Sequence, residues 1–191
     1  MIENFKSFCS AIVKFNEEEW AAMEKCLGVK TLKKNQHFLR SGEVCTKMGF
    51  ITHGSTRLYF LIDGIEVTKD FCFENTFTGS VASFQARKPA RFNVVAMEDT
   101  QLVTLEFALL EGLFARYHCW SNLIRIVLVH FAIRKENREI SFLLNTAEER
   151  YMDLIDTNPG ILQRVSLKYI ASYLGITPET VSRIRNKMAG N

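Results

Sequence analysis

Two charged side chains near the end of the chain are spaced so that they can read DNA bases together. Glu179 and Arg183 are four residues apart, which places them on one face of a helix. An arginine can donate two hydrogen bonds to O6 and N7 of a guanine, and a glutamate can accept one from the amino group of a cytosine. The pair therefore predicts recognition of base edges in a major groove. An exposed ion pair between the two is the alternative, and it is worth only a few tenths of a kcal/mol.

The residues around this pair follow the steric pattern of a helix-turn-helix. Ala171 is the small residue that two closely crossing helices need, and Gly175 permits the positive φ of a tight turn. Thr177 is expected to cap the second helix, and Pro178 fits its first position. The predicted shared core consists of Ile170, Leu174, Ile176, Val181 and Ile184. An ordinary helical hairpin is the alternative, and the basic charge of the segment argues against it.

Other polar residues of this segment are predicted to contact the phosphates of DNA, which set affinity and register rather than sequence. Ser166 is in addition the expected N-cap of the first helix. The full predicted DNA-binding set is Ser166, Lys168, Thr177, Pro178, Glu179, Thr180, Ser182, Arg183, Arg185, Asn186 and Lys187.

The charge of the chain is unevenly distributed. The net charge is only +3 over 191 residues, with 24 basic and 21 acidic side chains. Residues 163–191 hold five basic side chains and one acidic side chain, so the rest of the chain is close to neutral. This asymmetry favours a polyanion-binding segment on a near-neutral body, with a solvated helix face as the alternative.

Residues from about 29 to 106 have the pattern of a β-domain. Short runs of aromatic and β-branched residues alternate with glycines. Asp63-Gly64 separates two such runs and predicts a two-residue hairpin turn. Several short strands with turn residues between them indicate a closed or sandwiched β-domain, preceded by a short helix at about 17–27.

Residues from about 107 to 144 have the pattern of a helix with two apolar faces. A helix that is apolar on both sides must be covered on both sides, so one face can pack on the β-domain and the other on a second copy of the chain. Burial of the helix within one chain is the alternative. The predicted homodimer interface consists of Trp120, Ile124, Val127 and Phe131, which follow a 4-3-4 spacing.

A further helix is expected to begin at Thr146. The sequence Thr146-Ala-Glu-Glu149 is a capping box, in which the threonine and the second glutamate satisfy each other's backbone N–H groups. The helix should run to about residue 156 and end at Asn158-Pro-Gly160.

At this point the sequence resembles the Crp/Fnr family of bacterial regulators. Residues 177–184 (TPETVSRI) are similar to the recognition helix of that family, in which a Glu and an Arg four residues later read G·C pairs. Residues 50–59 (FITHGSTRLY) resemble its sensor strands. The resemblance implies a β-roll like that of cyclic-nucleotide-binding domains, a homodimer formed through the central helix, and binding to a palindromic DNA site.

We therefore expect an α+β fold in three parts: an antiparallel β-roll (double-stranded β-helix) sensor domain over residues 1–115, a dimerisation helix over 116–145, and a helix-turn-helix domain over 146–191. The implied partners are double-stranded DNA and a second copy of the chain, with RNA polymerase as a further candidate. We expect no membrane partner.

The resemblance does not extend to the cyclic AMP site. Sensors of cyclic AMP carry a Gly-Glu pair and a later Arg-Ser pair, whereas here Gly79 precedes Ser80, and Ala90 and Arg91 stand at the later pair. We expect an effector other than cyclic AMP, whose identity the sequence leaves open. The candidate effector-binding residues are Gly79, Ser80, Arg87 and Arg91, with a solvated loop as the alternative for the arginines.

No cofactor or metal is predicted. The five cysteines are widely spaced and include no CxxC pair, so we expect reduced thiols in a cytoplasmic protein. They are not grouped near the N-terminus as in iron–sulfur sensors of the family, and the four histidines show no ligand pairing that would indicate haem. We also expect no signal peptide, because residues 1–6 lack an uninterrupted apolar core, and no apolar run approaches the ~20 residues that could span a bilayer.

Two other functions remain as alternatives to a non-enzymatic transcription regulator. The first is a small-molecule-binding β-roll whose helix-turn-helix binds protein rather than DNA. Its motivation is the altered cyclic AMP site, together with the lack of wing strands after the recognition helix. The second is a cupin-like enzyme, which would need convergent metal ligands such as an HxH pair, and the sequence contains no such pair.

Overall fold

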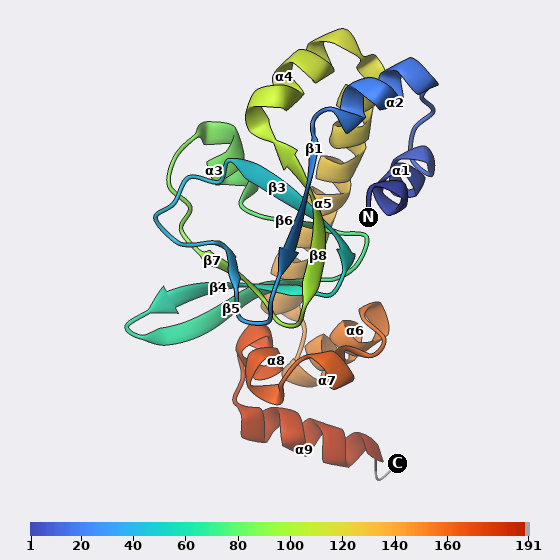
Figure 1. The fold of residues 1–191 in the computed structure, drawn as a ribbon. Coiled ribbons are helices and arrows are strands. Elements are labelled where there is room, and N and C mark those ends of the chain that lie inside the picture. Colours follow the sequence, from blue (N-terminus) through green and yellow to red (C-terminus); the bar gives the residue numbers. More distant parts are fainter. Residues whose placement is uncertain (190–191) are drawn as a thin grey trace.

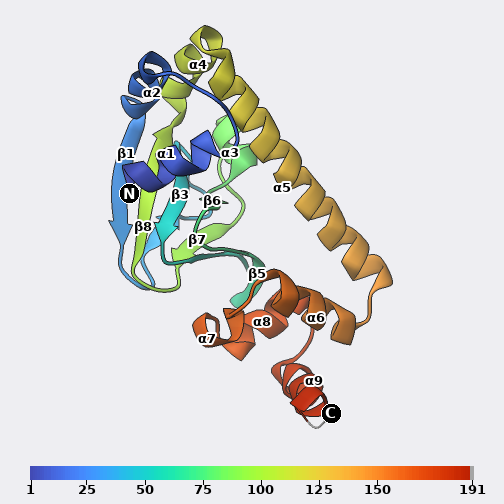
Figure 2. The same ribbon diagram turned by 90° about the vertical axis from the view of Figure 1, so that its right-hand side faces the viewer.

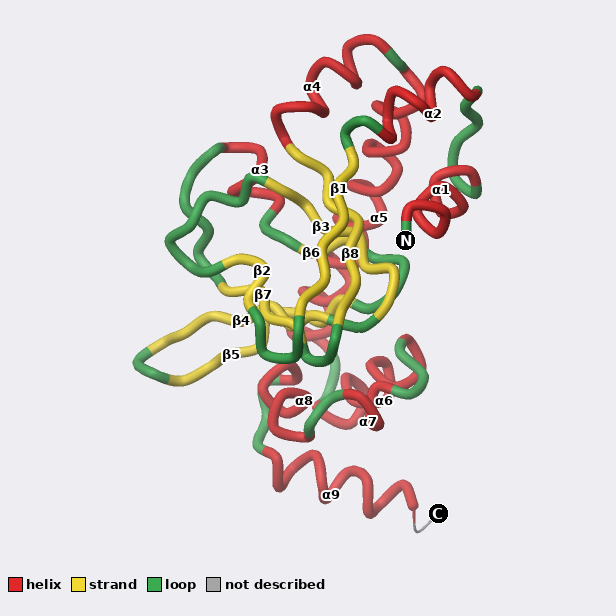
Figure 3. The backbone as a smooth tube through the Cα atoms, in the orientation of Figure 1, coloured by secondary structure: helices red, strands yellow, loops and turns green. Residues whose placement is uncertain are grey.

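The computed structural model describes residues 1–189, and it shows a β-domain between two groups of helices (Figure 1). The strands of the β-domain are β1 (Leu27–Leu32), β2 (His37–Leu39), β3 (Lys47–His53), β4 (Thr56–Ile62), β5 (Ile65–Cys72), β6 (Phe77–Thr78), β7 (Asn93–Ala96) and β8 (Thr100–Glu106). Figure 3 shows these strands together in the middle of the molecule, with helices above and below them.

The strands form two antiparallel sheets within the described residues. One sheet has the order β1-β8-β3-β6 and the other has the order β2-β7-β4-β5. A core of apolar side chains from both sheets lies between them, and Leu32, Ile51, Val94 and Leu102 are fully buried there. This confirms the predicted α+β fold with an antiparallel β-domain.

The predicted hairpin is the connection between β4 and β5. Ile62 pairs with Ile65, and the two residues between them have positive φ, 50° at Asp63 and 79° at Gly64. A two-residue turn of this kind matches the twist of the flanking strands. The hairpin leaves β5 at the edge of its sheet.

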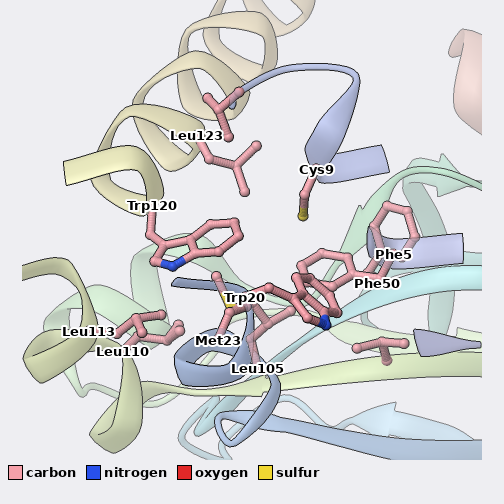
Figure 4. Close-up of a cluster of buried hydrophobic side chains, with 12 residues drawn as sticks. Phe5, Cys9, Trp20, Met23, Phe50, Leu105, Leu110, Leu113, Trp120 and Leu123 are labelled. Atoms are coloured by element: carbon pink, nitrogen blue, oxygen red, sulfur yellow. The ribbon is translucent and has the colours of Figure 1, made fainter. Parts of the chain in front are cut away.

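The helices before the β-domain are α1 (Ile2–Ser10) and α2 (Glu17–Glu24). The second corresponds to the predicted short helix, whereas the first was not predicted. Phe5 and Cys9 of α1 are fully buried against the β-domain, beside Trp20 of α2 (Figure 4). The N-terminal segment is therefore part of the core.

The helix expected from residue 107 is two helices, α4 (Phe107–Arg116) and α5 (His118–Leu144). Tyr117 between them is extended, with φ −124° and ψ 106°, so the chain changes direction there. The long helix α5 then runs down one side of the molecule (Figure 2). Among residues 1–189, no helix is both long enough and apolar enough to cross a membrane.

The prediction that Trp120 contributes to the dimer interface is wrong. Its side chain is 0% exposed and lies in the core of its own chain, with its ring centre 4.9 Å from that of Phe15 and 6.3 Å from that of Trp20. The indole N–H donates to the carbonyl oxygen of Glu19 at 3.1 Å. Helical spacing identified an apolar face, but Phe15 and α2 of the same chain cover the start of that face.

The last part of the described chain is helical and comprises α6 (Ala147–Thr157), α7 (Ile161–Arg164), α8 (Leu167–Leu174) and α9 (Pro178–Ala189). The capping box at Thr146 and Glu149 is present, with both reciprocal hydrogen bonds. The chain then turns at Gly160, whose φ is 86°. Both the beginning and the end of α6 are thus as predicted.

Replacing Trp120 by alanine should strongly destabilise the protein. The change removes a fully buried indole that packs α5 against α2 and Phe15, and we expect the free energy of unfolding to fall by about 3–5 kcal/mol. Equilibrium unfolding in urea measures this loss.

Leu109→Ala is the matched control, because Leu109 of the neighbouring α4 is 47% exposed. Its effect should stay within about 0.5 kcal/mol. Equal losses in the two variants would contradict the position of Trp120 in the core.

Candidate nucleic-acid interface and sensor cavity

The helices α8 and α9 form the predicted helix-turn-helix. Gly175 ends α8 in the left-handed conformation, with φ 69°, and the N–H of Ile176 donates to the carbonyl oxygen of Ala171 at 3.0 Å. The N–H of Thr180 donates to the side-chain oxygen of Thr177 at 3.3 Å, so Thr177 caps α9 as expected. Of the predicted shared core, Ile170, Leu174, Val181 and Ile184 are buried, and Ile176 is partly buried.

The outer face of α9 carries the two predicted base-reading residues. Glu179 and Arg183 are both exposed. Hydrogen bonds from its own backbone N–H and from the Thr177 side chain lower the pKa of Glu179, which therefore remains an ionised acceptor. Within residues 1–189 the guanidinium of Arg183 forms no ion pair, with Glu179 or with any other carboxylate. The exposed ion pair that we considered as an alternative is not formed.

Some of the predicted phosphate-binding side chains are exposed and unpaired within the described chain, whereas Lys187 already has a partner. Lys168 and Arg185 are exposed. Ser166 is exposed and is the N-cap residue of α8, but in the described chain its hydroxyl forms no capping hydrogen bond. The ammonium of Lys187 instead bonds both carboxylate oxygens of Glu148 on α6, at 3.0 and 2.9 Å. Lys187 would have to leave this carboxylate to contact a phosphate.

The remaining members of the predicted set lie along the same helix. Pro178 and Asn186 are exposed, whereas Thr180 and Ser182 are half-buried. Thr180 lies within 3.2 Å of the Thr177 hydroxyl. The structure thus places most of the set on the outer face of α9 and near the start of α8.

The helix α8 is attached to the edge of the β-domain. The backbone N–H of Thr68 on β5 donates to the hydroxyl of Ser172 at 2.8 Å, and that hydroxyl donates to the carbonyl oxygen of Glu66 at 3.4 Å. The aromatic ring of Phe71 on β5 also joins the core of the helix-turn-helix. Because an exposed sheet edge has unpaired backbone groups, Ser172 completes part of the hydrogen bonding of β5. The contact joins residues 104 positions apart and was not predicted from the sequence.

A buried arginine lies under the same contact. Arg57 on β4 is 2% exposed and forms an ion pair with Glu66 of β5. Its guanidinium carbon is 4.3 Å from the ring centre of Tyr59 and 3.8 Å from that of Tyr169 on α8. Arginine stacked on an aromatic ring is stabilised by the negative face of the ring. Arg57 therefore links the sensor sheet to the helix-turn-helix through packing.

A second ion-pair cluster joins the two parts near α7. The guanidinium of Arg164 donates to both carboxylate oxygens of Glu74 at 2.9 Å, and to Glu98 at 3.1 and 2.6 Å. Burial alone would raise the pKa of Glu74, but hydrogen bonds from Arg164 and from the N–H of Gly54 lower it below its usual value. Arg164 was part of the basic excess seen in the sequence, and these carboxylates neutralise its charge.

A cavity of about 310 Å³ lies between the β-domain and α5. Two of the predicted effector-binding residues, Gly79 and Ser80, line it, and Arg87 and Arg91 do not. The hydroxyl of Ser80 accepts from the N–H of Ser83 and so caps α3 (Val81–Ala86). Arg87 ends that helix with a positive φ and stacks on Phe107 at 4.8 Å.

Three of the residues predicted for the dimer interface face this cavity. Ile124, Val127 and Phe131 of α5 all contribute to its lining. Ile124 and Val127 are half-buried, and Phe131 is 37% exposed.

Among the described residues there is no group of three or more His, Cys, Asp or Glu side chains that could hold a metal ion.

Comparison with known proteins agrees with this architecture. Residues 29–117 match the family described as "Cyclic nucleotide-binding domain". No curated protein sequence matches the chain significantly. The fold is similar to that of solved Crp/Fnr-type regulators, and FixK2 from Bradyrhizobium japonicum aligns with a TM-score of 0.74 at 20% identity, over 86% of this chain and 85% of that one.

Two other solved structures give the same result over nearly the whole chain. A CooA mutant from Carboxydothermus hydrogenoformans aligns with a TM-score of 0.70 at 17% identity, over 88% of this chain and 78% of that one. A putative transcriptional regulator of the Crp/Fnr family from Eubacterium rectale aligns with a TM-score of 0.69 at 16% identity, over 92% of this chain and 84% of that one. Residues 29–117 are therefore similar to a cyclic-nucleotide-binding domain, and the chain has the fold of the Crp/Fnr regulators.

Ser172→Ala should loosen the helix-turn-helix from the β-domain. The change leaves the backbone N–H of Thr68 without its acceptor, and a buried donor without a partner costs about 1–3 kcal/mol. Urea unfolding and hydrogen exchange at the Thr68 amide measure this effect.

Ser166→Ala is the control, since the Ser166 hydroxyl forms no capping bond in the described structure. Its unfolding free energy should change by no more than about 0.5 kcal/mol. Unchanged protection of the Thr68 amide in Ser172→Ala would show that the two domains are not joined in this way in solution.

Proposed function

We propose that the protein is a transcription regulator that binds a palindromic DNA site as a homodimer, with α9 in the major groove. The observation that carries this proposal is the outer face of α9, on which an ionised Glu179 and an exposed Arg183 lie one helical turn apart. A helix-turn-helix places the N-terminal part of its second helix against the base edges. Double-stranded DNA and RNA polymerase are then its expected partners, and it would act in the cytoplasm.

The long helix α5 supports the homodimer. Val129, Ile133, Ile140 and Leu144 are apolar and between 45% and 78% exposed, and their spacings of four and seven residues place them on one face. A row of apolar side chains at this spacing is typical of helices that pair with each other. We propose that this face, rather than the face that begins with Trp120, forms most of the interface.

We also propose a division of the chain into a sensor domain over residues 1–115, a dimerisation helix over 116–145 and a DNA-binding domain over 146–191. The extended residue Tyr117 and the capping box at Thr146 support the two boundaries. The contact between α8 and β5 crosses the second boundary. The orientation of the DNA-binding domain is therefore expected to depend on the sensor domain.

Arg183→Ala should relax the sequence preference at one base position of each half-site by about 1–3 kcal/mol, because a bidentate contact to guanine is lost. Lys168→Ala should weaken binding to all sequences by a similar factor and reduce the salt dependence, since a phosphate contact is lost. Titration of matched and single-base-changed duplexes at several salt concentrations separates the two effects.

Lys34→Ala is the control for the loss of a positive charge, because Lys34 is exposed in a turn of the β-domain. Equal loss on every duplex for both Arg183→Ala and Lys168→Ala would contradict base recognition by Arg183. Absence of salt-dependent binding to any duplex would favour the alternative, in which the helix-turn-helix binds a protein.

A further inference from the structure

The cavity between the β-domain and α5 is lined mainly by apolar side chains. These come from both sheets and from α5, and they include Leu58, Phe77, Phe92, Leu105, Ile124 and Val127. At about 310 Å³ the cavity lies at the small end of the range for small-molecule sites, which are commonly about 300–1,000 Å³. Its ligand should therefore be small and largely apolar.

Few charged groups reach the cavity, and most of them already have partners. Asp70 of β5 is almost fully buried and accepts from Arg134 at 2.8 Å and from Lys135 at 2.5 Å, both on α5. Within residues 1–189, the ammonium of Lys69 forms neither a hydrogen bond nor an ion pair. Its ammonium lies 5.1 Å from the ring centre of Phe92, which is also part of the lining.

The backbone explains why Lys69 is directed to this place. Leu58 pairs with Asp70 and the next residue, Tyr59, pairs with Thr68, so Lys69 is the extra residue of a β-bulge. A bulge turns a side chain away from the regular alternation of a strand and is frequent beside functional sites. Burial, and secondly the nearby Lys135, lower the pKa of Lys69 to about 8, and Asp70 opposes this only partly. The amine is thus partly buried and forms no ion pair within the described chain.

We propose that the cavity binds a small apolar carboxylic acid, with its hydrocarbon part among the apolar residues and its carboxylate on the ammonium of Lys69. An ion pair with a carboxylate would compensate the burial of this ammonium. A cyclic nucleotide fits the same lining poorly, because Ser80 stands where the resemblance implies a ribose-binding glutamate and Arg91 lies outside the cavity. The ligand would be the effector of the DNA-binding function proposed above, and its regulatory role rests on that function.

The position of Lys69 also indicates how the ligand would act. Its neighbour on one side, Thr68, is bonded to Ser172 of α8, and its neighbour on the other side, Asp70, is bonded to α5. A ligand carboxylate bound to Lys69 would compete with Asp70 for Arg134 and Lys135. We therefore expect occupancy of the cavity to shift both the dimerisation helix and the helix-turn-helix.

The test is calorimetric titration of the full chain with 4-phenylbutyrate and with decanoate, compared with the neutral 4-phenylbutanamide and with cyclic AMP. Both acids should show saturable binding, and 4-phenylbutyrate should bind about tenfold more tightly than its amide, as expected for one charge-assisted hydrogen bond. Lys69→Met should weaken the binding of both acids by about the same factor and change the affinity for the amide by no more than about twofold. Lys34→Met, at an exposed turn, should change neither the affinity for the acids nor that for the amide.

Four results would overturn the proposal. They are no saturable binding of either acid, equal affinity for the acid and its amide, unchanged acid affinity in Lys69→Met, and tighter binding of cyclic AMP than of both acids. Binding of the acids is measured without DNA, so it can succeed where the DNA-binding proposal fails. Repeating the duplex titration with 4-phenylbutyrate then tests regulation, and an unchanged DNA affinity would exclude the regulatory role alone.

Discussion

The edge strand β5 is the element on which the rest of the structure depends. An edge strand must satisfy its free backbone groups or cover them, and β5 does so by bonding Ser172 of the helix-turn-helix. The buried carboxylate of Asp70 needs cations, and α5 supplies them. The cavity, α5 and the helix-turn-helix therefore meet within three consecutive residues, 68–70.

The features that sequence predicted well are local ones. The hairpin at Asp63-Gly64, the capping box at Thr146 and the left-handed Gly175 each depend on a few neighbouring residues whose conformational preferences are strong. The same holds for α9, where residue type and helical spacing suffice to place Glu179 and Arg183 on one face. The antiparallel β-domain followed from repeated strand and turn signals. These elements could be predicted because each is stabilised within its own segment.

The features that sequence missed depend on contacts between distant segments. Trp120 was assigned to a dimer interface because helical spacing defines a face but not what covers it, and Phe15 and Trp20 of the same chain cover it. Arg164 was counted as free positive charge, whereas Glu74 and Glu98, more than 60 residues earlier, neutralise it. The bulge at Lys69 arises from the pairing of β4 with β5 and leaves no mark in composition. Each case requires the tertiary structure.

The central claim is that a homodimer binds one DNA duplex with its two α9 helices. Each α9 belongs to a helix-turn-helix that packs against the β-domain of its own chain. Selection of random-sequence duplexes by the full chain, followed by sequencing, tests this most directly. The account predicts an inverted repeat with G·C pairs in each half-site and one fixed spacing, near a helical turn of about 10 base pairs. Lack of enrichment by the folded dimer, or half-sites enriched at freely varying spacing, would contradict it.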